Sequence, residues 1–195
     1  PSTPQGTEAN IAKVKVELPK RLPSRLTTLQ KACPAAIFEA NPASCPAAST
    51  VGIAKAVTPI LPVPLMGPAI FVSHGGEAFP SLIIVLQGYG VTVDLVGTTF
   101  ISKAGITSST FKTVPDVPVG TFELYLPEGK DSALAANGNL CTGKPLLMPT
   151  EFVAQDSPVS PVIHQSTKIA VTGCPKAKAA RASRSRAKGR KRAAR

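Results

Sequence analysis

The chain has 195 residues, which is enough for one domain with a hydrophobic core. Its longest apolar runs are far shorter than the ~20 residues that a membrane-spanning helix requires. Twenty prolines and fifteen glycines, with only 5% aromatic residues, favour many short strands separated by turns. The composition therefore predicts an all-β fold with minor α content.

The net charge of +11 is concentrated at the C-terminus. All eleven acidic residues and twelve of the twenty-two Lys and Arg residues precede Cys174, so this part carries only +1. The twenty residues Lys176–Arg195 hold ten cations, no acidic residue and no large apolar side chain. Such a segment cannot bury enough surface to fold, and we expect a disordered basic tail over residues 175–195. Residues 1–10 are expected to be disordered too, which leaves 11–174 as the folded domain.

Four cysteines occur without a CxxC pair, and the chain has two histidines, which argues against a zinc site. Three disulfide connectivities are possible. We favour Cys33 with Cys45, which closes a proline-rich loop, and Cys141 with Cys174, which fastens the last strand. Four separate buried thiols are the alternative. Disulfides form outside the reducing cytoplasm, so we expect an extracellular or cell-surface protein, as a mature form or C-terminal fragment of a longer precursor.

In chain order, apolar and charged residues alternate over Ala12–Leu18, which predicts a strand with one buried face. Apolar residues at helical spacing then predict a short helix that starts at Ser24 and ends at Pro34. The following segment, up to residue 46, is expected to be a loop or helical turn. A weak strand over Val51–Val57 precedes the proline-rich segment Thr58–Pro68, which we expect along a sheet edge because proline lacks a ladder donor.

The centre of the fold is predicted within Phe79–Val96. The apolar run Leu82–Leu86 suits a strand buried on both faces, whereas the alternation over Val91–Leu95 suits a strand with one solvated face. Residues 88–90 would form a three-residue loop that ends in a left-handed glycine. Further strands are expected over residues 69–73, 106–114, 119–126, 150–155 and 162–172. Such closely spaced short strands predict a disulfide-stapled β-sandwich.

Two patterns suggest a catalytic site. Ser73, His74 and Asp94 could form a triad, and the glycines after His74 are similar to an esterase oxyanion loop. No GxSxG nucleophile elbow is present, so a glycine turn after a strand is the preferred interpretation. His164 is expected to be a solvated surface residue. No catalytic residue is assigned.

The sequence predicts no cofactor site, either from its carboxylates or from phosphate-binding motifs. The carboxylates with the most suggestive positions are scattered, and their spacing fits neither a glycosidase pair nor a calcium loop. These are Asp94, Glu123, Glu128 and Asp131. Neither a phosphate-binding glycine loop nor a dinucleotide-binding fingerprint occurs, and no cofactor or metal is expected.

The basic tail is the predicted binding element, because a run of cations attracts polyanions through counterion release. Envelope polymers, acidic lipids and DNA are all polyanions, but the tail has no aromatic residue to stack on bases. The predicted polyanion-binding residues are Lys176, Lys178, Arg181, Arg184, Arg186, Lys188, Arg190, Lys191, Arg192 and Arg195.

Several segments together resemble a known family: LPSRLTTLQKAC, SHGG, VLQGYGVTVDLVG, GITSSTF, SALAANGNLC and TKIAVTGC. Over Ile11–Cys174 the chain resembles a domain found near the C-termini of large secreted bacterial surface proteins of the actinobacterial type. The resemblance implies an extracellular β-rich module that carries cysteines and ends in a basic tail. The family has no established activity, so the resemblance carries over no catalytic residue.

These observations predict a non-enzymatic structural or adhesion module of a secreted or cell-surface protein, whose basic tail binds anionic envelope polymers or matrix. The alternative hypothesis is a nucleic-acid-binding or compacting protein that acts through the same tail. Disulfides in the domain argue against that alternative. An esterase-like hydrolase is a third hypothesis, and it depends on Ser73 and His74.

Overall fold

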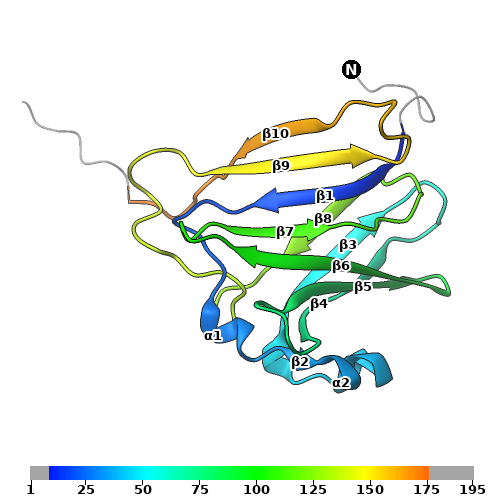
Figure 1. Ribbon diagram of the computed structural model, residues 1–195, viewed down its shortest axis with the longest axis horizontal. Coiled ribbons are helices and arrows are strands. Elements are labelled where there is room, and N and C mark those ends of the chain that lie inside the picture. The colour runs from blue at the N-terminus through cyan, green and yellow to red at the C-terminus, as the bar shows by residue number, and fades with distance from the viewer. Residues whose placement is uncertain (1–8, 176–195) are drawn as a thin grey trace, which may run out of the picture.

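A computed structural model describes residues 9–175. Ten strands are hydrogen-bonded into one curled sheet (Figure 1). The strands are β1 (Ile11–Glu17), β2 (Cys33–Pro34), β3 (Thr50–Val57), β4 (Leu65–Ser73), β5 (Ser81–Gly88), β6 (Val91–Ile101), β7 (Thr107–Phe111), β8 (Thr121–Tyr125), β9 (Leu147–Ala154) and β10 (Ile163–Lys168). The helices are α1 (Leu26–Leu29) and α2 (Ala35–Ala40), followed by the 3-10 turns η1 (Pro42–Ser44) and η2 (Ala47–Ser49). The predicted all-β class is confirmed, whereas the predictions for residues 1–8 and 176–195 lie outside the described residues.

The strand order is β10-β9-β1-β7-β6-β5-β4-β3-β8, and β2 pairs with β4 in parallel. The first strand of the chain therefore lies inside the sheet, between β7 and β9. The predicted strand is confirmed, with Val14 and Val16 on one face of β1 and the charged residues on the other. Every residue of β1 is half-buried, so the expected difference in burial between the two faces is not seen. All neighbours along this order run antiparallel.

The sheet curls so that its inner face encloses the main core. Ala54 of β3 and Ile84 of β5 belong to one buried cluster, and Leu124 of β8, Leu95 of β6 and Phe111 of β7 pack against it. Strands from distant positions in the sheet thus contribute to the same core. The two packed layers that the sequence predicts are formed by one continuous sheet that curls over its own inner face, and not by two separate sheets.

A second, smaller core lies on the outer face of β4 and β5, where α2 and β2 cover it. Phe38 of α2 packs here with Cys33, which is completely buried. The predicted helix over residues 24–33 was wrong in extent, because only Leu26–Leu29 is helical. Cys33 and Pro34 are extended, since they pair with Val72 and Ser73 of β4, and this tertiary pairing overrides the helical spacing.

The central hairpin is formed by β5 and β6, as predicted. Its turn differs from the prediction, because Gly88 pairs with Val91 and leaves a loop of only Tyr89 and Gly90. Both loop residues have positive φ, 51° at Tyr89 and 75° at Gly90. This geometry is that of a type I′ turn, whose twist matches that of the flanking strands. Tyrosine at the first position was not anticipated because left-handed residues are mostly glycine, asparagine or aspartate.

The prediction that Thr58–Pro68 lies along a sheet edge was wrong for its last four residues. Leu65–Pro68 begins β4, which lies between β3 and β5. The β4–β5 pairs are formed on either side of residues 67 and 68 but not at them. Pro68 therefore occupies a gap in this ladder, where a residue without an N–H donor is accommodated.

Candidate functional site

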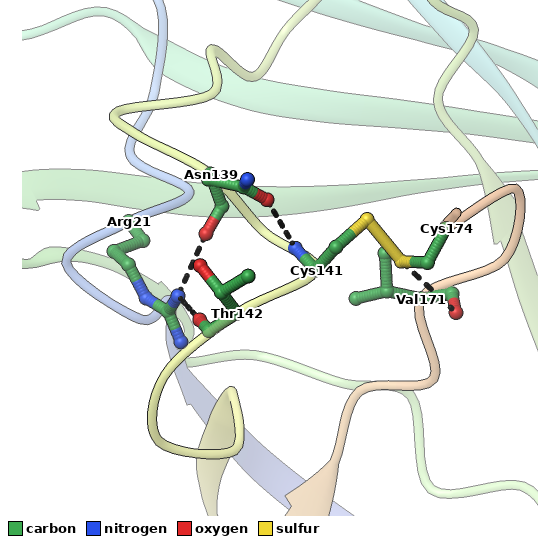
Figure 2. The surroundings of a disulfide bond; sticks show 6 residues. All are labelled: Arg21, Asn139, Cys141, Thr142, Val171 and Cys174. Carbon is green, nitrogen blue, oxygen red and sulfur yellow. Dashed lines mark hydrogen bonds between the residues drawn. A yellow bond between two sulfur atoms is a disulfide. The ribbon is translucent and has the colours of Figure 1, made fainter. Parts of the chain in front are cut away.

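The point where the basic tail leaves the domain is fixed by a disulfide. Cys174 is bonded to Cys141, with their Cα atoms 5.5 Å apart (Figure 2). Cys33 is bonded to Cys45 in the same way, so the favoured connectivity is confirmed. Lys176, the first of the ten tail cations, follows Cys174 after one intervening residue. The cationic residues themselves lie outside the described part of the chain, and only their attachment point is described.

The loop that carries Cys141 is held in place by Arg21. The Nη1 atom of Arg21 donates a hydrogen bond of 2.8 Å to the carbonyl oxygen of Asn139 and a second one to that of Thr142 (Figure 2). Its Nη2 atom donates to the carbonyl oxygen of Lys144. One guanidinium group thus binds three main-chain oxygens of the same loop, which its fork of donors makes possible.

Further hydrogen bonds connect this loop to its neighbours. The side-chain oxygen of Asn139 accepts from the amide of Cys141 at 2.8 Å. The amide of Asn137 donates to the carbonyl oxygen of Arg21, and that of Ile169 donates to Leu146, each at 2.8 Å. The disulfide therefore joins two segments that the main chain already holds together. Arg21 was not recognised from the sequence, because its partners are more than 115 residues away in the chain.

A hollow of about 600 Å³ lies beside the Cys141–Cys174 bond. Residues 140–146 and 168–171 line it, together with Cys174. Its charged lining residues are Lys144 and Lys168, and it has no lining carboxylate. Within residues 9–175 neither lysine forms an ion pair. The hollow can therefore accept an anionic group at the place where the tail begins.

A second hollow, of about 330 Å³, lies over β1, β9 and β10. Lys15, Glu17, Glu151 and His164 line it, and they come together because Lys15 pairs with Glu151 and Glu151 with His164 across the strands. Lys13 binds Glu151 at 3.0 Å, and Lys15 binds Glu17 at 2.7 Å. The hydrogen bond from Lys13 lowers the pKa of Glu151, and the hydrogen bond to Glu17 raises the pKa of Lys15. The lysines of this cluster are thus already paired with carboxylates.

His164 is exposed, as expected, but the sequence did not reveal its neighbours. The cluster is assembled by pairing between β1, β9 and β10, which are far apart in the chain. Alternation within one strand identifies its exposed face but not the strand that lies beside it.

The structure does not bring Ser73, His74 and Asp94 together. Asp94 pairs with Val85 in the middle of the β5–β6 ladder, whereas Ser73 lies at the end of β4, beyond the Val72–Ser81 pair. The His74 amide donates to Glu77 at 2.8 Å. Hydrogen bonds from its own backbone amide and then from the Ser73 hydroxyl hold the pKa of the Glu77 carboxyl below its usual value. These contacts stabilise the glycine turn after β4.

The remaining carboxylates are dispersed over the surface. Asp131 accepts a hydrogen bond of 2.8 Å from Lys31, which lowers its pKa. Glu123 lies on β8, opposite Lys55 of β3. Throughout residues 9–175, His, Cys, Asp and Glu never gather in a group of three or more that could hold a metal ion. In the same range every helix is too short or too polar to cross a membrane.

Comparisons with protein-family models, with curated proteins and with solved structures find no match to this chain. The resemblance to the C-terminal domains of secreted bacterial surface proteins therefore stays a prediction. Function has to be argued from the geometry of the chain itself.

Proposed function

We propose that this protein is a non-enzymatic module of a secreted or cell-surface protein, and that its C-terminal tail holds it to an anionic polymer of the cell envelope or matrix. The observation that carries the proposal is the bond between Cys141 and Cys174, next to which the ten cations begin. A disulfide at this point means that a pull on the tail is transmitted directly to the folded domain. Such a link suits an anchoring segment.

Charge distribution supports the same assignment. The domain carries almost no net charge, and three of its lysines are paired with carboxylates at 2.7–3.0 Å. Lys144 and Lys168 differ, because they line the hollow at the tail's attachment point without a carboxylate beside them. An anionic polymer bound by the tail would meet these two lysines next. These two lysines thus add positive charge beside Cys174, where the tail begins.

The two disulfides support an oxidising location, because such bonds persist outside the cytoplasm. They also disfavour the alternative of a nucleic-acid-compacting protein that works inside the cell. Within residues 9–175 no contact favours DNA over other polyanions, so binding to duplex DNA is measured as well.

The test compares the full chain with a full-length variant in which all ten tail cations are changed to glutamine. Both proteins are applied to a matrix of polyglutamate and to isolated cell envelopes, and eluted with increasing salt. We expect the native chain to be retained at low salt and released as salt rises, because each neutralised anion releases counterions. The variant should pass through, with an unchanged melting temperature.

Retention of the variant on both materials would refute the proposal. The proposal would also be refuted if the native protein bound duplex DNA much more tightly than the envelope at physiological salt, since this result would favour the nucleic-acid alternative. A truncation at Pro175 serves as a second variant and should behave like the glutamine variant.

A further inference from the structure

One end of the sheet is unusually apolar. There, the β3–β4 connection (residues 58–64), the β5–β6 turn (residues 89–90) and the end of the β7–β8 connection (residues 117–120) lie side by side. The amide of Gly120 donates to the carbonyl oxygen of Val57 at 2.8 Å. A β-carbon placed on Gly88 would lie 3.0 Å from the carbonyl oxygen of Pro64. The three connections therefore form one contiguous surface, which we call the apolar end.

Eight large apolar side chains at this end are exposed to solvent. They are Val57, Ile60, Val63, Met66, Tyr89, Val91, Val119 and Phe122. No charged residue occurs within the connections themselves, whereas Lys55, opposite Met66, and Glu123, next to Phe122, lie on the strands behind them. Single exposed apolar residues are common on soluble proteins, but a contiguous group of this kind marks a surface that binds something apolar.

The chemistry of the apolar end favours a lipid bilayer over a protein partner. Four of its side chains stand on the three connections, and the other four lie on the strand ends beside them. Protein interfaces combine an apolar centre with polar and charged residues that fix the orientation, and the three connections have no charged residue. A bilayer requires no such complementarity. Tyr89, at the apex of the β5–β6 turn, is a residue type that concentrates at membrane–water interfaces.

We propose that the apolar end inserts into the surface of a lipid bilayer, with Ile60, Val63 and Tyr89 entering the boundary between head groups and acyl chains. Burial of apolar side chains at this depth is the usual driving force for such insertion. The apolar end and the attachment point of the tail lie at opposite ends of the sheet (Figure 1). The insertion therefore does not depend on the tail.

The absence of tryptophan from the chain provides a direct test. Tyr89→Trp places a single fluorophore at the apolar end, and Tyr125→Trp places one on β8 outside it. The two tyrosines are equally exposed, at 70% and 69%, so they form a matched pair. Full-length proteins are mixed with neutral phosphatidylcholine vesicles, which offer no net charge to the tail. We expect the emission of Y89W to shift to the blue and to be quenched by lipids brominated on the acyl chains, whereas Y125W does not respond.

A loss-of-function variant completes the test. Changing Ile60, Val63 and Tyr89 to serine should lower partitioning into neutral vesicles at least about tenfold, because apolar burial is lost, with the same melting temperature. Y89W carrying the glutamine tail should still respond to neutral vesicles, so a failure of the tail hypothesis would leave this result intact. Equal responses of Y89W and Y125W, or none, would overturn the proposal. A blue shift of Y89W that grows with protein concentration without vesicles would also overturn it, by indicating contact between copies of the chain.

Discussion

Gly67 of β4 lies so close to β5 that a β-carbon added to it would be 1.7 Å from the carbonyl oxygen of Val85. No side-chain rearrangement can relieve this clash, because the opposing atom belongs to the main chain. We expect Gly67→Ala to force β4 and β5 apart and to lower the free energy of unfolding by about 3 kcal/mol. Urea denaturation monitored by circular dichroism measures this change.

Gly120→Ala is the matched control for that substitution. The nearest atom to a β-carbon at Gly120 is 3.5 Å away, which is ordinary contact, and its φ is not left-handed. Its amide still donates to Val57 after the change. We expect a change below about 1 kcal/mol. Similar losses for both variants would contradict the assignment of strain to the β4–β5 contact.

Removing the Cys33–Cys45 bond should destabilise the smaller core. Cys33 is completely buried beside Phe38 and Ile70, and the bond closes the segment that contains α2. The double substitution Cys33→Ala and Cys45→Ala should lower the free energy of unfolding by about 2–4 kcal/mol, through greater freedom of the unfolded chain. Addition of reductant to the native protein should produce at least this loss, because it opens the Cys141–Cys174 bond as well. A denaturation midpoint that stays unchanged would show that packing alone holds α2 in place.

Arg21→Lys should loosen the loop that carries Cys141. A lysine can bind fewer of the three carbonyl oxygens that Arg21 binds in the loop. We expect the free energy of local opening to fall by about 1–2 kcal/mol, so that the amide of Cys141 exchanges hydrogen roughly tenfold faster. Amides of β5 should be unaffected. Lys20→Gln is the control, and equal exchange in both variants would argue against the role of Arg21.

Acidification should weaken the fold through Glu151 and Asp131. Hydrogen bonds from Lys13 and Lys31 hold their pKa values below the ordinary 4.5 and 3.8. A carboxyl whose pKa is lowered by folding contributes stability above its unfolded pKa and loses that contribution as the pH falls through the folded pKa. Stability should therefore decline below about pH 4.5.

Lys13→Gln isolates the part of this pH dependence that belongs to Glu151. Urea denaturation at a series of pH values should give a shallower acid decline for this variant than for the native protein. The effect is small, because the ion pair is partly exposed to solvent. Lys103→Gln, at a position without an ion pair in residues 9–175, should leave the decline unchanged. An identical acid decline for Lys13→Gln would exclude the Lys13–Glu151 contact as its source.

The sequence predicts β1 and the β5–β6 hairpin well because alternation over β1 and β6, and a branched apolar run in β5, are local patterns typical of strands. The same reasoning wrongly placed Pro68 at a sheet edge. Its place in a central strand depends on a gap in the β4–β5 ladder, and the position of that gap is not encoded near Pro68. The turn at Tyr89 was also predicted incorrectly. Because Gly88 pairs with Val91, Tyr89 lies in a two-residue turn and has a positive φ, which tyrosine rarely adopts.

The sequence predicts only part of the candidate site. Four cysteines and the basic tail indicate a fastened cationic end, but Arg21 and the pair Lys144 and Lys168 become neighbours only through folding. The apolar end was also hidden. Its three segments each look like an ordinary proline- or glycine-containing turn, and their shared location follows from strand order, which periodicity does not report.

The Cys141–Cys174 bond closes a covalent ring that contains β9 and β10. A protease that cuts anywhere between Thr142 and Gly173 would open this ring without releasing Lys176–Arg195, because the sulfur bridge still joins the two pieces. After such a cut, the cationic end would be released only if the Cys141–Cys174 disulfide were also reduced. Among cuts that follow Cys141, one beyond Cys174 would release it in a single step.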